Sequence, residues 1–415
     1  MAGLFVLGGS SYYTLQFFEA LCASGLGARF DRITLFGRNR ARLDLIAEAG
    51  AEMLGGGVAV DATTAIEDCL NPQYDILFNQ MRFGGLHARD MDERIATDVG
   101  LAADETLGIV GISNALRTVT GMAPYRAVIA QKADPFTFVN FTNPCSILCQ
   151  SLLGAIAAPV IGVCDYPAFM RCVIADQFGE APAAVELDYF GLNHFGIIYG
   201  VRIDGRDMFD AAMAAPLSFK PASNRYFDHL LNVSWSFVFE ADRIVARQRT
   251  QTNRASALLQ IDAQGDALLE RGVRDADAFL GILAQRQCDW YQLAVEPALA
   301  HLLGERRPKT YLNCATGDVF GLGLDRTIIE TSCSVTGGAV VAAPLPDSVR
   351  ASPEFAMIAT MKQAETMLLD AIAARDGGGV IASCLVNPMI RDADRCIAYF
   401  DRLRALDPII AAFWS

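Results

Sequence analysis

The stretch Leu4-Phe5-Val6-Leu7-Gly8-Gly9-Ser10-Ser11 decides the fold class of this 415-residue chain. A short apolar run ends in two glycines and two serines, and residues 12–23 then form a predicted helix. A strand, a glycine turn and a helix in this order direct backbone amides and the helix dipole to one point, where a pyrophosphate can bind. A complete Gly-x-Gly-x-x-Gly pattern would have glycine in place of Ser10 and Tyr13, so an ordinary strand–helix turn stays an alternative here.

Further short apolar runs, with helical segments between most of them, continue over the first 163 residues. The runs cover residues 33–36, 58–60, 76–78, 136–139 and 160–163. This alternation is typical of a parallel sheet that helices cover on both faces. Beyond it we expect antiparallel strands over 186–198 and 199–203 with a turn at Asp204-Gly205, and helices over 226–249 and 276–303. The sequence therefore predicts an α/β fold with a Rossmann-like doubly wound sheet over 1–163 and an α+β domain over 164–415.

The composition excludes several classes of partner. The net charge of −13 and the pI near 4.8 disfavour nucleic acids and anionic membrane surfaces. No apolar run approaches the length of a membrane span, and no leader-like segment follows Met1. The 11 cysteines are an odd number without a Cys-x-x-Cys pair, which is typical of buried thiols in a reducing compartment. We expect a cytoplasmic protein.

A thiol, a carboxyl group and an imidazole follow the last predicted parallel strand. They belong to Cys164-Asp165 and to His194 of Gly191-Leu192-Asn193-His194. One thiolate and one imidazole would hold a catalytic cation while leaving positions open for substrate. Taken singly, each residue has a plainer reading: a core cysteine, a helix-cap aspartate and a structural histidine on a strand.

The second predicted strand ends in Gly37-Arg38-Asn39. A dinucleotide site often has an acidic residue here that binds the adenosine ribose. Glycine followed by arginine suits a 2′-phosphate better, since the guanidinium can pair with it. Stacking of Arg38 on the adenine is the alternative.

As a set, these and other motifs resemble the family 4 glycoside hydrolases, the NAD- and manganese-dependent glycosidases. The matching stretches are 8–14, 82–85, Arg89, 92–95, Glu105-Thr106, 115–117, 140–144, 164–167, 191–196, Arg286, Tyr291 and 313–317. The Cys-Asp-x-Pro and Gly-Leu-Asn-His-Phe-Gly pair is most similar to the α-glucosidase and 6-phospho-α-glucosidase branch. The two-domain plan of this family is like that of lactate and malate dehydrogenases.

The resemblance implies a role for each matching residue. Cys164 and His194 would ligate Mn²⁺, Asp165 would be the general acid, and Tyr291 would be the base. The remaining residues would bind the NAD or NADP cofactor (Gly8, Gly9, Ser10, Ser11 and Arg38) or the sugar (Arg89, Glu105 and Asn143). By itself, the segment 89–94 also fits an exposed helix face with ion pairs, and Tyr291 beside Trp290 also fits simple packing.

The implied reaction begins with hydride transfer from sugar C3 to the nicotinamide, which acidifies the hydrogen on C2. Loss of that proton expels the C1 substituent, water adds, and the hydride returns. The implied substrate is a small glycoside, α-linked and with an anionic sugar among the options, and the implied assembly is a homodimer or homotetramer. Departures from the family around residues 102–111 and Cys145-Ser146 put a standard 6-phosphoglucoside in question. A lactate- or malate-type dehydrogenase and a catalytically silent sugar sensor remain alternatives.

Overall fold

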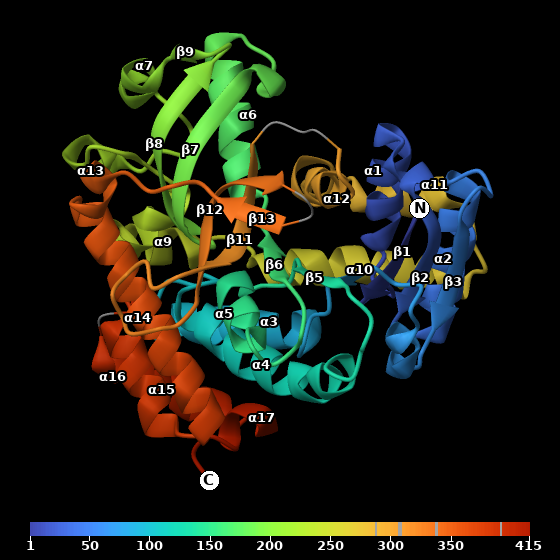
Figure 1. The fold of residues 1–415 in the computed structure, drawn as a ribbon. Coiled ribbons are helices and arrows are strands. Elements are labelled where there is room, and N and C mark those ends of the chain that lie inside the picture. The colour runs from blue at the N-terminus through green and yellow to red at the C-terminus, as the bar shows by residue number, and fades with distance from the viewer. Residues whose placement is uncertain (287–288, 306–308, 337–338, 391) are drawn as a thin grey trace.

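The computed structural model describes residues 1–415 except 287–288, 306–308, 337–338 and 391 (Figure 1). The strands are β1 Ala2–Leu7, β2 Phe30–Phe36, β3 Ala59–Thr63, β4 Ile76–Asn79, β5 Thr137–Asn140, β6 Val160–Val163, β7 Val185–Leu192, β8 Phe195–Ile203, β9 Arg206–Asp207, β10 Leu230–Leu231, β11 Thr310–Thr316, β12 Thr327–Thr336 and β13 Ala339–Ala342. The N-terminal helices are α1 Thr14–Ser24, α2 Arg40–Met53, α3 Gly85–Asp98, α4 Ile109–Ile129, α5 Cys145–Leu152, α6 Tyr166–Phe178 and α7 Phe209–Ala214. The later helices are α8 Ser236–Phe239, α9 Ala241–Gln248, α10 Arg254–Glu270, α11 Ala276–Leu283, α12 Glu296–Leu302, α13 Asp347–Arg350, α14 Pro353–Ala374, α15 Gly377–Val386, α16 Ala393–Arg404 and α17 Pro408–Ala411.

The N-terminal part of the sheet has the strand order of a doubly wound α/β fold. Strands β3, β2, β1, β4, β5 and β6 lie side by side in that order and pair in parallel. All six residues of β1 are buried, as the continuous apolar run predicts for a strand covered on both faces. The order reverses between β1 and β4, so their carboxyl ends open a crevice that serves as a ligand site in such sheets. The predicted doubly wound fold is confirmed.

The second part of the sheet is antiparallel and continues from β6 without interruption. Strand β11 pairs antiparallel with β6, and β12, β7, β8 and β10 follow. Figure 1 shows the β7–β8 hairpin in green, away from the blue N-terminal strands. The domain boundary expected at residue 163 stays a prediction, and one hydrogen-bonded sheet crosses it.

Later helices also return to the N-terminal core. Ile261 of α10 and Phe279 of α11 belong to the buried cluster that contains β1 and α1, and α10 packs against α3. None of the helices in the described part of the chain combines the length and the apolar character that a membrane span requires.

A buried ion-pair network fixes the C-terminal helices to α4. Arg117 on α4 binds Asp92 on α3 through two hydrogen bonds of 2.6 and 2.8 Å, and it binds Asp407, just before α17, at 2.5 Å. Asp92 also accepts from Ser113, whose hydroxyl contacts Tyr399 on α16. Arg117 is 2% exposed and Asp92 1%, so water screens the attraction between these two charges very little. The motif that contains Arg117 therefore serves packing in this chain.

Replacing Arg117 with Met should destabilise the protein strongly, because it leaves two carboxylates without their cation in a buried site. The expected loss is about 3–5 kcal/mol in the free energy of unfolding, measured by urea denaturation. The matched control is Arg402→Ala, which removes an exposed pair with Asp98 and should cost about 1 kcal/mol or less. Equal losses in the two variants would contradict the structural role of Arg117.

Candidate active site

One cavity of about 1180 Å³ brings the predicted cofactor, metal and sugar residues together. Of the predicted site residues, those that line it are Gly8, Ser10, Ser11, Arg38, Arg89, Glu105, Asn143, Cys164, Asp165, His194 and Tyr291. Gly9 is not among the lining residues. A side chain on Gly9 would collide with Leu35 at 2.7 Å, so Gly9 permits close packing of the turn on β2.

The glycine turn sits at the carboxyl end of β1, at the reversal point of the strand order. Gly8 has a φ of 91°, in the left-handed region that favours glycine, and the amides of Gly8 and Gly9 donate to the Phe36 carbonyl. Gln80, directly after β4, closes the crevice from the other side. Its Nε2 donates to the Thr14 hydroxyl at 2.8 Å and to the Gly8 carbonyl at 3.3 Å.

Ser10 and Gly37 fit each other across the turn. A Cβ on Gly37 would lie 2.7 Å from the Ser10 hydroxyl oxygen and 2.9 Å from its Cβ. The serine therefore fills the space where an acidic side chain at position 37 would begin. Arg38 is exposed beside this point and lines the cavity.

The predicted metal residues meet at the end of the parallel half of the sheet. Cys164 follows β6 directly, and Asp165 is the residue before α6. One ligand atom from each of Cys164, Asp165 and His194 lies within 4.8 Å of the others. Cys164 and His194 are buried, and Asp165 is half-buried.

His194 is not on a strand, and this corrects the predicted strand over 186–198. The hairpin turns at Asn193-His194, between β7 and β8, whereas Asp204-Gly205 forms the next turn. His194 has a φ of 66°, which is uncommon for a residue other than glycine. Its ring stacks on Tyr166, with centroids 3.9 Å apart and planes at 17°. The apolar pattern around this position predicted a continuous strand, but the chain turns there, and contacts of Asn193 with Glu330 and of His194 with Tyr166 stabilise the turn.

Burial governs the protonation of this cluster. Desolvation, with Glu330 and Asp165 nearby, raises the pKa of the Cys164 thiol well above its ordinary value. Desolvation also raises the pKa of Asp165, while His194, Arg286 and Arg254 partly oppose that rise. A cation at this site would reverse the balance for the thiol, because a metal ligand is held as the thiolate.

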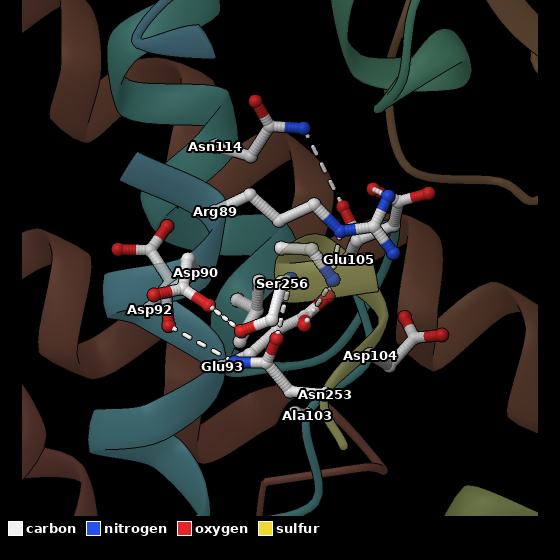
Figure 2. Close-up of polar contacts among 12 residues, drawn as sticks. Arg89, Asp90, Asp92, Glu93, Ala103, Asp104, Glu105, Asn114, Asn253 and Ser256 are labelled. Carbon is white, nitrogen blue, oxygen red and sulfur yellow. Dashed lines mark hydrogen bonds and ion pairs between the residues drawn. The ribbon is translucent and has the colours of Figure 1, made fainter. Parts of the chain in front are cut away.

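Buried Arg89 and half-buried Glu105 form an ionic cluster in the cavity lining (Figure 2). Arg89 reaches Glu105 at 2.5 Å and Glu93 at 2.6 Å, and Arg82 reaches Glu105 at 3.1 Å. Burial would raise the pKa of Glu105, but Arg89, Arg82 and then His194 lower it to about 2. Glu105 is therefore a carboxylate at neutral pH.

An exposed face for the segment 89–94 is therefore wrong for three of its members. Arg89, Asp92 and Glu93 are buried, because α10 and the C-terminal helices cover α3. Figure 2 shows Glu93 beside the start of α10, where its carboxylate accepts from the Ala255 amide at 3.0 Å. Arg94 alone keeps an exposed pair, with Asp90.

Tyr291 lies on a π-helical turn, Tyr291–Val295, directly before α12. The helix expected over 276–303 is thus interrupted, and residues 287–288 lie outside the described part of the chain. Such turns occur frequently at functional sites. The Tyr291 hydroxyl donates to Gln80 Oε1 at 2.7 Å, which fixes it at the reversal point of the sheet. The Tyr291 ring also packs against Phe17 and Phe141. The position of Tyr291 is therefore compatible both with a role as catalytic base and with a role in packing.

Three polar residues near the site went unnoticed in the sequence. Asp104 accepts hydrogen bonds from the amides of residues 106–108, and Gln80 anchors Tyr291. Glu330 is a fully buried carboxyl group on β12. The sequence did carry a signal for Glu330, because this charged residue directly follows two isoleucines, Ile328 and Ile329.

Comparison with known proteins agrees with this site. Residues 4–180 match the profile described as Family 4 glycosyl hydrolase, so the resemblance predicted from the motifs is confirmed there. The 6-phospho-beta-glucosidase BglT of Thermotoga maritima is 28% identical over 204 residues, 49% of each chain. The phospho-alpha-glucosidase PagL of Clostridium acetobutylicum is 27% identical over 201 residues, 46% of this chain and 44% of the relative. The chain thus spans about half the length of the curated relatives it matches.

Solved structures share the fold over nearly the whole chain. The structure of the 6-phospho-beta glucosidase from Thermotoga maritima with NAD and glucose-6-phosphate has a TM-score of 0.84 at 22% identity, covering 97% of this chain and 98% of that one. Malate dehydrogenase from Plasmodium falciparum has a TM-score of 0.55 at 11% identity, covering 90% of this chain and 99% of that one. The predicted dehydrogenase-like plan is therefore confirmed.

The resemblance implies that Cys164 and His194 are the two protein ligands of Mn²⁺, so Cys164→Ser and His194→Ala should each abolish Mn²⁺ binding. Binding is measured by the loss of the free Mn²⁺ signal in electron paramagnetic resonance. Nucleotide affinity and the unfolding temperature should change little. Cys149→Ser, at a buried thiol outside the cavity lining, is the matched control. If both site variants kept wild-type Mn²⁺ affinity, the ligand assignment would be wrong.

The Ser10–Gly37 fit predicts that the chain binds NADP(H) at least as well as NAD(H), because no carboxylate repels the 2′-phosphate and Arg38 can pair with it. Titration with both dinucleotides measures this. Arg38→Ala should weaken NADP(H) selectively, and Ser10→Gly/Gly37→Asp should shift the preference to NAD(H). A hundredfold preference of the wild type for NAD, about 3 kcal/mol, would contradict the prediction.

Proposed function

We propose that this chain is a glycosidase that works with a bound nicotinamide dinucleotide and a divalent cation, Mn²⁺ being the expected ion. The observation that carries the proposal is the shared cavity: the Cys164–Asp165–His194 cluster and Tyr291 open onto the same space as the glycine turn. An α-linked substrate is proposed from the Cys-Asp-Tyr-Pro motif, although the relatives include both α- and β-specific names.

The residues of the cavity fit both the divalent cation and the nicotinamide dinucleotide. A thiol and an imidazole with a nearby carboxyl group suit a cation such as Mn²⁺ or Zn²⁺, and open positions would remain for substrate oxygens. At the glycine turn, a Cβ on Gly8 would lie 2.8 Å from the Met81 amide nitrogen, so only glycine allows this tight turn against the chain that follows β4, the role of the first glycine in dinucleotide-binding turns.

When bound, the dinucleotide would take the hydride from sugar C3 and later return it, and the cation would polarise the neighbouring oxygens. Tyr291, oriented by Gln80, would then remove the acidified C2 proton. Asp165, which lines the cavity beside Cys164 and His194, would donate a proton to the departing glycosidic oxygen. Water addition would complete the hydrolysis.

The charges of the cavity favour an anionic sugar. The chain carries a net charge of −13, yet this cavity is lined by seven arginines and five acidic residues. Arg42, Arg82 and Arg89 have acidic partners. In the described part of the chain, Arg247 and Arg254 make no ion pair, and Arg254 is close enough to Asp165 to affect its pKa. A phosphorylated or carboxylated glycoside would supply the matching charge.

We also propose a cytoplasmic homodimer or homotetramer. The free thiols suit a reducing compartment. Tyr226, Val233 and Phe239 are exposed apolar side chains in one segment, and a second copy of the chain could cover them.

Hydrolysis in D₂O tests the proposal directly. Removal and return of the C2 proton should leave deuterium at C2 of the released sugar, detected by NMR. A glycosidase with two catalytic carboxylates never breaks a C–H bond and incorporates none. Product sugar with only hydrogen at C2 would therefore contradict the proposed mechanism even if hydrolysis occurs.

Tyr291→Phe should lose most turnover, on the order of 10²–10⁴-fold, because it removes the base and keeps the ring. Nucleotide affinity should be preserved. Tyr199→Phe, which lies outside the cavity, is the matched control and should keep full activity. Full activity in Tyr291→Phe would show that this tyrosine only packs.

A further inference from the structure

Glu330 lies at the centre of the antiparallel part of the sheet, behind the metal-ligand cluster. On β12 it faces Asn313 of β11 on one side and Gly191 of β7 on the other. It is fully buried, and it is not among the residues that line the cavity. The proposed reaction assigns it no chemical step.

The carboxyl group of Glu330 joins the two segments that carry the proposed ligands. The Cys164 thiol lies close enough to it for the Glu330 charge to raise the pKa of the thiol. Asn193, the turn residue before His194, donates to Oε1 at 3.5 Å. From the far side, Asn313 donates to Oε1 at 2.8 Å and the Tyr189 hydroxyl donates to Oε2 at 2.9 Å.

Both segments need such support. The Cys164 backbone follows the last parallel strand, whereas His194 sits in a turn with a φ of 66°. A residue in that region stays there only when its surroundings determine it. A buried carboxyl group is itself costly unless its hydrogen bonds are made. Glu330 accepts hydrogen bonds from Asn193 in the turn and from Asn313 and Tyr189, and it lies beside the Cys164 thiol.

We propose that Glu330 is a positioning residue that holds Cys164 and the Asn193-His194 turn at the separation a divalent cation requires. The inference rests on the proposed function, since it presupposes that Cys164 and His194 bind a metal. Groups that orient metal ligands in this way typically change metal affinity 10–100-fold when they are replaced.

The test is Mn²⁺ binding, followed by electron paramagnetic resonance on the full chain. Glu330→Asp keeps the carboxyl group but withdraws it by one methylene, so it should bind Mn²⁺ about 10–100-fold more weakly. Glu330→Gln keeps the length, and its amide can donate to Asn193 Oδ1 or Asn313 Oδ1, which have no partner among the described residues. Glu330→Gln should therefore bind Mn²⁺ more tightly than Glu330→Asp. The control is Glu354→Asp, the same change at a buried carboxyl group that contacts His229 and does not line the cavity, and it should stay near the wild type in Mn²⁺ affinity.

Dinucleotide affinity and unfolding temperature are measured on every variant, and a positioning role predicts that metal affinity falls while dinucleotide affinity does not. If Glu330→Asp fails to fold, Asn193→Ala removes the same link from the turn side and should also weaken Mn²⁺ binding tenfold or more. If Glu330→Asp or Asn193→Ala folds and keeps wild-type Mn²⁺ affinity, the positioning role of Glu330 is wrong, but the proposed function is not affected. A wild-type chain that binds no Mn²⁺ would instead overturn the proposed metal-dependent function.

Discussion

The antiparallel pairing of β11 with β6 is the constraint on which the rest of the structure depends. Leu312 pairs with Val163 and Asn313 pairs with Gly162, so the parallel half of the sheet continues into the antiparallel half. Position 162 must be glycine for this contact, because a Cβ there would lie 2.2 Å from the Cys145 sulfur and 2.9 Å from Asn313. Cys164, two residues later, is thereby placed beside the β7–β8 hairpin that carries His194.

The same continuity explains how distant segments share one cavity. The glycine turn lies at the carboxyl end of β1, and Cys164 lies at the carboxyl end of β6 in the same parallel set. The segment of α10 to α12 then crosses back over the N-terminal core and brings Tyr291 onto Gln80. Some of the charges that line this space are balanced by neighbours, as in the Arg82–Arg89–Glu105 cluster. Arg247 and Arg254 make no ion pair with the described residues.

The sequence predicted the parallel strands well, and all the predicted site residues except Gly9 line one cavity. The predictions failed where tertiary packing overrides a local pattern. Strands such as β1 and β6 are continuous apolar runs, and their pattern alone identifies them. The hairpin at Asn193-His194 lacked glycine, so its positive φ could not be foreseen from turn chemistry. The polar pattern of α3 indicated a solvent-exposed helix face, whereas long-range contacts from α10 and α16 bury it. Glu330 contacts Tyr189 and Asn193, which lie more than a hundred positions earlier in the chain, so only the folded structure shows these contacts.

The central claim is that oxidation and reduction occur within one hydrolytic turnover, so the dinucleotide is not consumed. The most direct measurement follows aryl alcohol release and NAD(P)H absorbance together, using aryl α- and β-glycosides with neutral or anionic sugars. The account predicts release that depends on both Mn²⁺ and the dinucleotide, with no net reduced cofactor. Net NAD(P)H formed in proportion to substrate would identify a dehydrogenase. Tight sugar binding without release would identify a sensor, and either result would contradict the account.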